Sequence, residues 1–169
     1  MASGAGKSAA LLFLVINLIL YLVVIILAAW DVDHAMEKTH ETASVLTIPA
    51  RIFPIYFPKG NMATGFFVIY SLIAGVVGFM NSVTGIYHVM AWNPPSLHAA
   101  AASSLATWTI TLLSMGLACK EINIGYADSS LRTLEIMVII LSGSQLICLG
   151  AIQAGVQDIE NEEAFSGRV

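Results

Sequence analysis

The chain has 169 residues, of which 57% are hydrophobic and only 11% charged, and its mean hydropathy is +0.82. Ordinary globular domains carry about 25% charged residues, so the composition excludes a typical water-soluble domain. The formal net charge is −4 and there is no basic tract, which removes the electrostatic basis for nucleic-acid binding. The length allows one compact unit, and we predict a single membrane domain over 1–169.

The first membrane helix is predicted over about residues 8–30. The run from Ala9 to Trp30 is uncharged, and as a helix it is about 33 Å long, enough to cross a bilayer with modest tilt. A secretory signal peptide has a shorter apolar core of about 7–15 residues, so we expect this helix to be retained. Asn17 is costly in lipid and is expected to face a neighbouring helix.

A long loop, residues 31–60, is predicted to follow the first helix. Its first part, Asp31–Ser44, is charged and is compatible with a short solvated helix. Its second part, Ile48–Pro58, carries three prolines among aromatic residues, which forbids a regular helix. The aromatic rings suit the headgroup region. We therefore expect this part to lie along the membrane surface or to fold over the bundle.

The next sixty positions, Gly60–Cys119, contain no Asp, Glu, Lys or Arg. One crossing needs about 20 apolar residues, and the stretch is interrupted at Asn93-Pro94-Pro95-Ser96. We predict two membrane helices joined by a short turn, over about 62–90 and 96–119. A backbone in lipid must satisfy its own hydrogen bonds, which a helix does.

Small residues in these two helices form stripes at regular spacing. Because helices in lipid associate through close packing of small residues, we interpret both stripes as helix-packing faces rather than as a pore lining. The stripe of the second helix has heptad spacing, and the stripe of the third helix recurs every fourth residue. The residues are Ser71, Gly75, Gly78, Ser82 and Gly85 in the second helix and Ala99, Ser103, Thr107 and Thr111 in the third.

The fourth helix is predicted over about 131–155, after the capping signal Asp128-Ser129-Ser130. Arg132 and Glu135 follow at i, i+3 and can pair on its surface. The acidic tail, 156–169, is predicted to be mobile. The predicted fold class is therefore an all-α membrane protein, a four-transmembrane-helix bundle with a long loop between the first two helices.

Several motifs resemble those of the plant AWPM-like plasma-membrane family, over nearly all of the chain. The resemblance implies a four-helix plasma-membrane protein of the response to abscisic acid, cold and drought, with a link to abscisic acid uptake. It is carried by Gly116–Gly125 (GLACKEINIG), by Asn17, Leu18, Tyr21 and Trp30, by Gly60–Phe67 (GNMATGFF) and by Ala99–Ser104.

Two criteria give opposite predictions for the side of the membrane on which the termini lie. Only Lys7 and Arg168 lie on the side of the termini, whereas the other five basic residues lie opposite, and basic loops favour the cytosol. A more distant similarity to claudin-type four-helix proteins implies cytosolic termini instead. We follow the resemblance and expect cytosolic termini.

Three residues are candidates for substrate binding, if abscisic acid is the ligand. It joins an apolar ring to one carboxylate, and Arg51 and Lys59 flank the aromatic loop segment where they could hold that group. Their alternative role is to anchor lipid phosphates or to pair with acidic residues of the loop. His88, beside the predicted turn, could respond to pH or bind substrate, and its alternative is interfacial hydrogen bonding.

Two functions remain open. The first is a facilitator of abscisic acid entry, and four helices leave so little interior room that this requires an oligomer. The second is a non-transporting structural or accessory subunit, a scaffold or oligomer packed against a larger membrane complex. No ionisable carboxylate or amine lies deep in a predicted span, which disfavours an ion-coupled pump. No catalytic set or zinc-ligand spacing is present, so we expect no enzyme, no cofactor and no metal.

Overall fold

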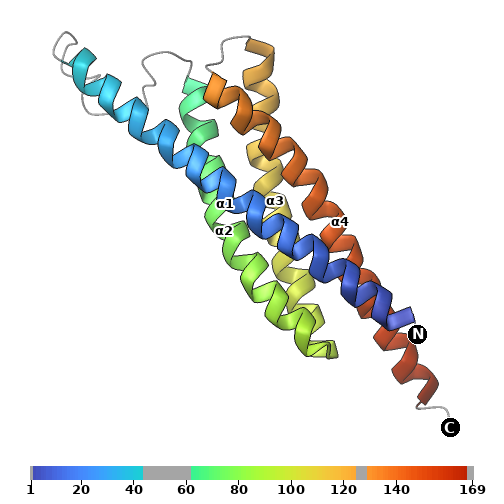
Figure 1. Cartoon of the computed structure of the whole chain (residues 1–169). Helices are drawn as coiled ribbons and strands as arrows, with labels where there is room; N and C mark the ends of the chain where they lie inside the picture. The colour runs from blue at the N-terminus through green and yellow to red at the C-terminus, as the bar shows by residue number, and fades with distance from the viewer. Residues whose placement is uncertain (1, 44–61, 125–128, 167–169) are drawn as a thin grey trace.

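A computed structural model describes residues 2–43, 62–124 and 129–166, which form four helices joined in one bundle (Figure 1). The helices are α1 (Ala2–Ala43), α2 (Met62–Ala91), α3 (Pro94–Ile124) and α4 (Ser129–Ser166). Each contains a stretch of 29 to 33 residues that is long and apolar enough to cross a membrane. The predicted four-helix all-α membrane fold is confirmed.

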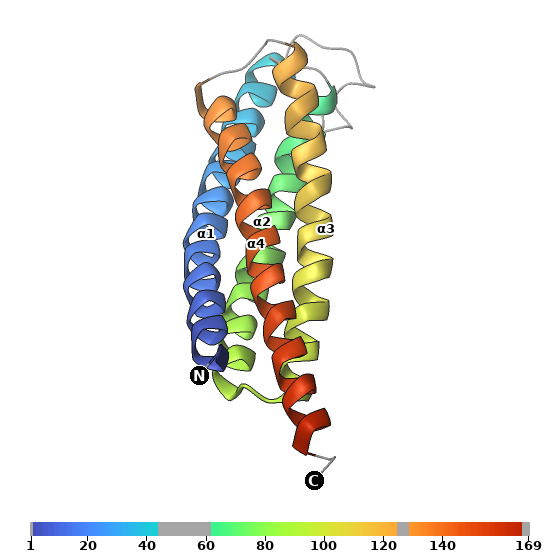
Figure 2. The same ribbon diagram turned by 90° about the vertical axis from the view of Figure 1, so that its right-hand side faces the viewer.

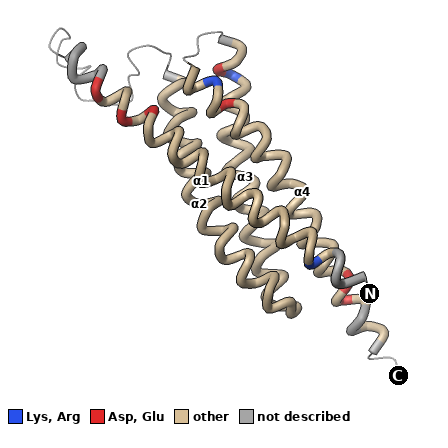
Figure 3. The backbone as a smooth tube through the Cα atoms, viewed as in Figure 1, with Lys and Arg blue, Asp and Glu red and all other residues tan. Residues whose placement is uncertain are grey.

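The four helices run antiparallel to their neighbours around a square, in which α1 contacts α2 and α4, and α3 contacts the same two helices (Figure 2). Both termini and the turn between α2 and α3 therefore lie at one end, which we call the terminal end. The other end, where α1 and α3 finish and α2 and α4 begin, we call the loop end. Charged residues gather at these two ends and are absent from the middle (Figure 3).

Buried residues recur in each helix at alternating steps of three and four. In α1 they are Ala10, Leu14, Asn17, Tyr21, Val24, Ala28 and Asp31. In α3 the series is Leu97, Ala100, Ser104, Thr107, Thr111, Ser114, Ala118 and Glu121, and Ala101 beside it is buried as well. This 3.5-residue period keeps one face of a helix against its neighbours along its whole length, as in a coiled coil. The bundle is therefore packed through heptad seams.

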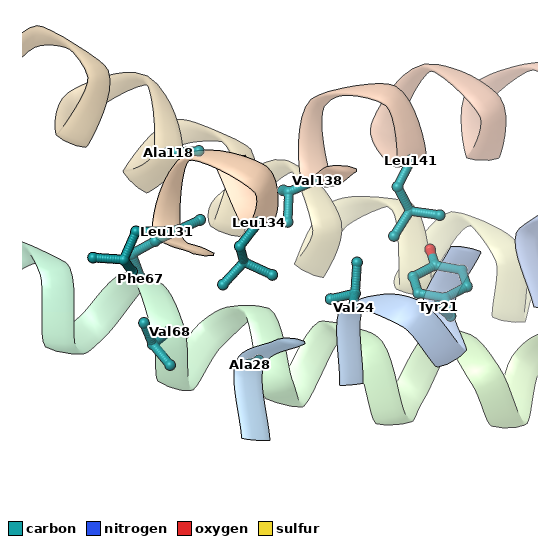
Figure 4. Packing of buried hydrophobic residues seen from close by; sticks show 10 residues of the cluster. All are labelled: Tyr21, Val24, Ala28, Phe67, Val68, Ala118, Leu131, Leu134, Val138 and Leu141. Atoms are coloured by element: carbon teal, nitrogen blue, oxygen red, sulfur yellow. The ribbon is translucent and has the colours of Figure 1, made fainter. Parts of the chain in front are cut away.

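The core consists of two apolar clusters. Figure 4 shows the cluster towards the loop end. All four helices contribute residues to it, among them Tyr21, Phe67, Ala118 and Leu134. The cluster towards the terminal end includes Leu14, Val89, Leu97, Cys148 and Ile152. Side chains thus fill the interior at both levels, with polar residues between them.

Helix ends differ from the predicted bounds mainly in α1 and α4. The second helix begins and ends close to the predicted 62–90, but α1 continues through Ala43 into the predicted loop, and α4 continues to Ser166 into the predicted mobile tail. Neither extension contains Gly or Pro, and both are rich in good helix formers such as Ala and Glu, so nothing stops the helix where its apolar part ends. The segment Ile48–Pro58 lies outside the described residues.

Candidate functional site

A buried hydrogen-bonded cluster links α1 to α4 near the middle of the bundle. The Asn17 amide donates to Gln145 Oε1 at 2.8 Å, and the Ser144 hydroxyl donates to Asn17 Oδ1 at 2.6 Å. Asn17 and Gln145 are completely buried. The Gln145 Nε2 group has no hydrogen-bond partner in the described part of the chain. Asn17 thus faces a neighbouring helix, and one amide donor remains free in the centre.

One turn along α1, Tyr21 connects the same level to α3. Its hydroxyl lies 3.0 Å from Thr111 Oγ1. The Thr111 hydroxyl hydrogen already bonds to the Thr107 carbonyl at 2.9 Å, so Tyr21 is the donor in this pair. Asn17, Tyr21, Thr111, Ser144 and Gln145 together form a polar layer between the two apolar clusters, to which Tyr21 contributes its hydroxyl while its ring belongs to the cluster at the loop end.

The five small residues predicted to pack from α2 are all buried. A Cβ atom at Gly78 would overlap the Tyr21 ring, and one at Gly85 would lie 2.9 Å from Leu14 Cδ2. Gly75 lies in the same way against Ile25 of α1. The two serines of this seam, Ser71 and Ser82, bond to the Ser114 hydroxyl at 2.7 Å and to the carbonyl of Gly78 at 2.8 Å respectively. This seam therefore holds α2 against α1 and α3 inside the bundle.

The stripe predicted on α3 is divided between two faces. Thr107 and Thr111 are buried, whereas Ala99 and Ser103 are exposed. A spacing of four residues advances 400° around a helix, so such a stripe drifts by about 40° at each step. Over twelve residues it therefore leaves the buried face, and the heptad position next to it, Ser104, is buried instead.

Three carboxyl groups are buried at the loop end, where the sequence predicted only surface charges. Asp31, Glu121 and Glu135 are 5%, 3% and 2% exposed. Thr64 of α2 donates to Glu121 Oε2, and Ser130 of α4 donates to Asp31 Oδ1, both at 2.6 Å. No group of three His, Cys, Asp or Glu among the described residues is placed to hold a metal ion.

The predicted surface pair of Arg132 and Glu135 is not formed. Arg132 is exposed, but Glu135 turns into the bundle, and the ion pair seen in the described residues joins His98 to Glu160 at 3.3 Å. The signal that sequence reasoning missed is the register: Glu121 and Glu135 both occupy buried positions of their heptads.

Of the three candidate substrate residues, the structure describes only His88. Arg51 and Lys59 lie outside the described residues. His88 lies in the last turn of α2, at the terminal end, half-buried and edge-on to Tyr87. His88 is 26 residues from Met62, the first residue of α2, which is about 39 Å along the helix. It therefore lies at the opposite end of α2 from the end that follows Lys59 in the sequence.

An unpredicted contact closes the terminal end. Lys7 of α1 donates to the carbonyl of Met90 at 3.0 Å and lies 5.6 Å from the centre of the Trp92 ring. Trp92 has a φ of 44° in the turn between α2 and α3, and its ring lies where a Cβ at Gly155 of α4 would be 2.9 Å away. A cation–π contact and the missing side chain of Gly155 thus fix this turn against α1 and α4.

The helices differ in the size of the side chains that they expose on the outer surface of the bundle. The described outer faces of α1 and α2 carry many large apolar side chains, whereas α3 exposes only three within its described length: Leu105, Leu113 and Ile122. Its other exposed positions include Ala99, Ala102, Ser103, Ala106 and Gly116. On α4, Gly143 and Gly150 are exposed with open space where a side chain would be. Around these glycines α4 also exposes large apolar side chains, among them Ile140, Leu146 and Ile147. We use the name outer small-residue face for the exposed small residues of α3 and α4 named here.

Comparison with known proteins gives a consistent match. Residues 15–155 match the model of the AWPM-19-like family. The chain is also 39% identical over 155 residues to "Membrane protein PM19L" of rice, Oryza sativa subsp. japonica, which covers 91% of this chain and 82% of the relative. No solved structure matches the chain.

Proposed function

The chain belongs to the AWPM-19-like family, and on this premise we propose that it facilitates abscisic acid uptake at the plasma membrane during the response to abscisic acid, cold and drought. The role is non-catalytic. Four apolar helices that can span a bilayer support a membrane protein, and the family resemblance supports the substrate. The termini lie in the cytosol, so the loop end faces outward.

The proposed mechanism rests on one observation. Side chains fill the interior of the bundle, whereas the outer surface has large apolar side chains on α1 and α2 and many small ones on α3. Two apolar clusters and the polar layer occupy the inside of the bundle. The small residues of the outer small-residue face leave space beside α3 and α4 and let another helix approach closely. The functional unit is therefore a homo-oligomer, and an apolar acid passes along the surfaces where copies meet.

Two charged residues of the segment between α1 and α2 select the substrate. Arg51 and Lys59 hold the carboxylate where it enters, and the apolar ring follows the lipid-facing path between copies. His88 lies at the other end of α2 and binds the acid as it leaves. This division of roles follows from the length of α2, which keeps the two ends of the path far apart.

Uptake of labelled abscisic acid into vesicles that contain the purified chain tests this proposal. We expect faster influx than into bare lipid vesicles between pH 5 and 7, and slower influx when Arg51 and Lys59 are both replaced by Gln. A matched control is Lys120→Gln, which removes an exposed cation near the end of α3. Equal influx with and without protein would reject the uptake function.

A non-transporting structural or accessory subunit is the second candidate. The packed interior favours it, because two apolar clusters of side chains occupy the described part of the bundle through which a bulky acid would have to pass. In that case the outer small-residue face packs against a larger membrane complex. Vesicles without influx, together with a stable complex of the tagged chain with other membrane proteins in mild detergent, would support this function over the first.

A further inference from the structure

Two amide side chains in the middle of the bundle each have a polar group without a hydrogen-bond partner among the described residues. Gln145 of α4 is completely buried, and its Nε2 group is unpartnered. Asn81 of α2 is 6% exposed, and its Oδ1 atom is unpartnered. The other end of each amide is used: Gln145 Oε1 accepts from Asn17 at 2.8 Å, and Asn81 Nδ2 lies 3.4 Å from the Ser104 hydroxyl oxygen. Each amide is therefore only half satisfied.

Exchanging the nitrogen and oxygen positions of these amides does not pair the remaining groups. With Gln145 and Asn17 both exchanged, Gln145 Nε2 donates to Asn17 Oδ1, and Gln145 Oε1 is left over. With Asn81 exchanged, its Oδ1 accepts from the Ser104 hydroxyl, and its Nδ2 is left over. In every orientation one buried polar group remains on each of the two side chains, a donor in one case and an acceptor in the other.

Both amides lie far from the ends of their helices. Gln145 is 16 residues from Ser129, the first residue of α4, which is about 24 Å along the helix. Asn81 is 19 residues from Met62, the first residue of α2, which is about 28 Å. The segments that the structure does not describe adjoin only the helix ends, and the apolar cluster towards the loop end separates the longest of them from both amides. Described residues therefore surround the two amides.

Hydroxyl groups of α2 and α3 lie at the same level of the bundle. Tyr21 of α1 contacts Gly78 of α2 and Thr111 of α3. One turn from these contacts towards the terminal end lie Ser82 in α2 and Thr107 in α3, both buried, and the same step along α1 reaches the asparagine of the amide pair. The hydroxyls of Ser82 and Thr107 donate to carbonyls of their own helices, so their oxygens can still accept a hydrogen bond. This level is therefore polar and lined by small side chains.

Water fits these groups, because it both donates and accepts, and buried waters typically bind polar groups that the protein leaves unpaired. An ion does not fit, since 8–30, 60–119 and 136–157 contain no Asp, Glu, Lys or Arg to compensate its charge. We propose that the bundle binds internal water at the middle of its membrane-spanning part, one molecule at Gln145 and one at Asn81. These waters complete the hydrogen bonding of the two amides. The inference is independent of abscisic acid uptake.

Solid-state NMR of the wild-type chain in lipid bilayers, with ¹⁵N in the side chains of Asn and Gln, tests this site. Magnetisation from water protons should reach the amide groups of Gln145 and Asn81, and this signal should be lost in D₂O. The chain has three glutamines, so Gln153→Met and Gln157→Met, which change exposed positions, identify the Gln145 signal as the one that remains. Asn81 is assigned through its own backbone. No substitution of a buried residue is needed.

The matched control is the Gln153 amide, which is exposed on the outside of the same helix within its apolar span. It should receive more magnetisation from lipid acyl protons than from water. Absence of water magnetisation at either Gln145 or Asn81 would overturn the water site at that amide. Magnetisation that comes from acyl chains instead would overturn it as well, because the occupant would then be lipid. Transfer from protein hydroxyls alone would also overturn it, because the amides would then pair directly with the protein.

Discussion

Tyr21 depends on the absence of a side chain at Gly78. The ring occupies the space of a Cβ on α2, and its hydroxyl donates to Thr111 on α3, so one residue of α1 joins three helices. We predict that Gly78→Ala destabilises the bundle by about 1–3 kcal/mol, because the ring must leave its position. Gly143→Ala adds the same methyl group in open space and should leave the melting temperature in detergent unchanged. Equal melting temperatures for the two variants would contradict this contact.

The amide pair of Asn17 and Gln145 allows a double-mutant cycle. Each single change to Leu leaves one buried amide without its partner, whereas the double change removes both. We predict a coupling energy of about 0.6–2 kcal/mol, the range for polar contacts between membrane helices. Chemical denaturation of the four proteins in detergent micelles measures it. Additive effects of the two changes would show that the hydrogen bond contributes nothing to helix association.

At the scale of the helix, the heptad is the feature that decides which side chains are buried. The seam of α2 could be predicted because its Gly and Ser residues contrast with large apolar neighbours. The same reasoning failed on α3, where Ala99–Ser104 is small at every position and periodicity cannot distinguish the faces. Glu121 and Glu135 were missed for a related reason. A charged residue near a helix end is usually solvated, and only the register between helices shows that these two point inward.

Two adjacent serines on α3 test the heptad directly. Ser104 is fully buried, with Asn81 Nδ2 at 3.4 Å from its hydroxyl, whereas Ser103 is exposed. We predict that Ser104→Leu destabilises the folded chain by about 1–3 kcal/mol through overpacking, and that Ser103→Leu leaves it unchanged. Melting temperatures in nanodiscs measure the difference. The reverse order of the two variants would favour the four-residue stripe over the heptad.

For the whole molecule, polar pairs set the register between α2 and α3. Thr64 of α2 bonds to Glu121 of α3. Ser71, seven residues later in α2, bonds to Ser114, seven residues earlier in α3. Apolar packing alone tolerates sliding by a heptad, but sliding here would leave buried hydroxyl and carboxyl groups unpaired in a medium without water. Composition and period thus predict four spanning helices, whereas their register depends on contacts between distant residues that no single helix reveals.

Self-association through the outer small-residue face gives the last prediction. Lipid-facing residues are usually large and apolar, as on α1 and α2, so Gly143 and Gly150 stand out where open space replaces a side chain. Two leucines there would hold a neighbouring copy away, because close approach of backbones requires small residues. We predict that Gly143→Leu with Gly150→Leu converts an oligomer into a monomer without lowering its melting temperature. Stepwise photobleaching of the labelled chain in vesicles counts the copies in each particle.

The control for this prediction adds the same bulk elsewhere on the surface. Ala29 is an exposed small residue of α1, and Ala29→Leu should leave the number of copies unchanged. If the double variant is monomeric and also loses abscisic acid influx, the path for the acid lies between copies, because each bundle is still folded. If it is monomeric and influx persists, one bundle is sufficient and the path runs along its own surface. A double variant with the wild-type number of copies would place the contact on another face of the bundle.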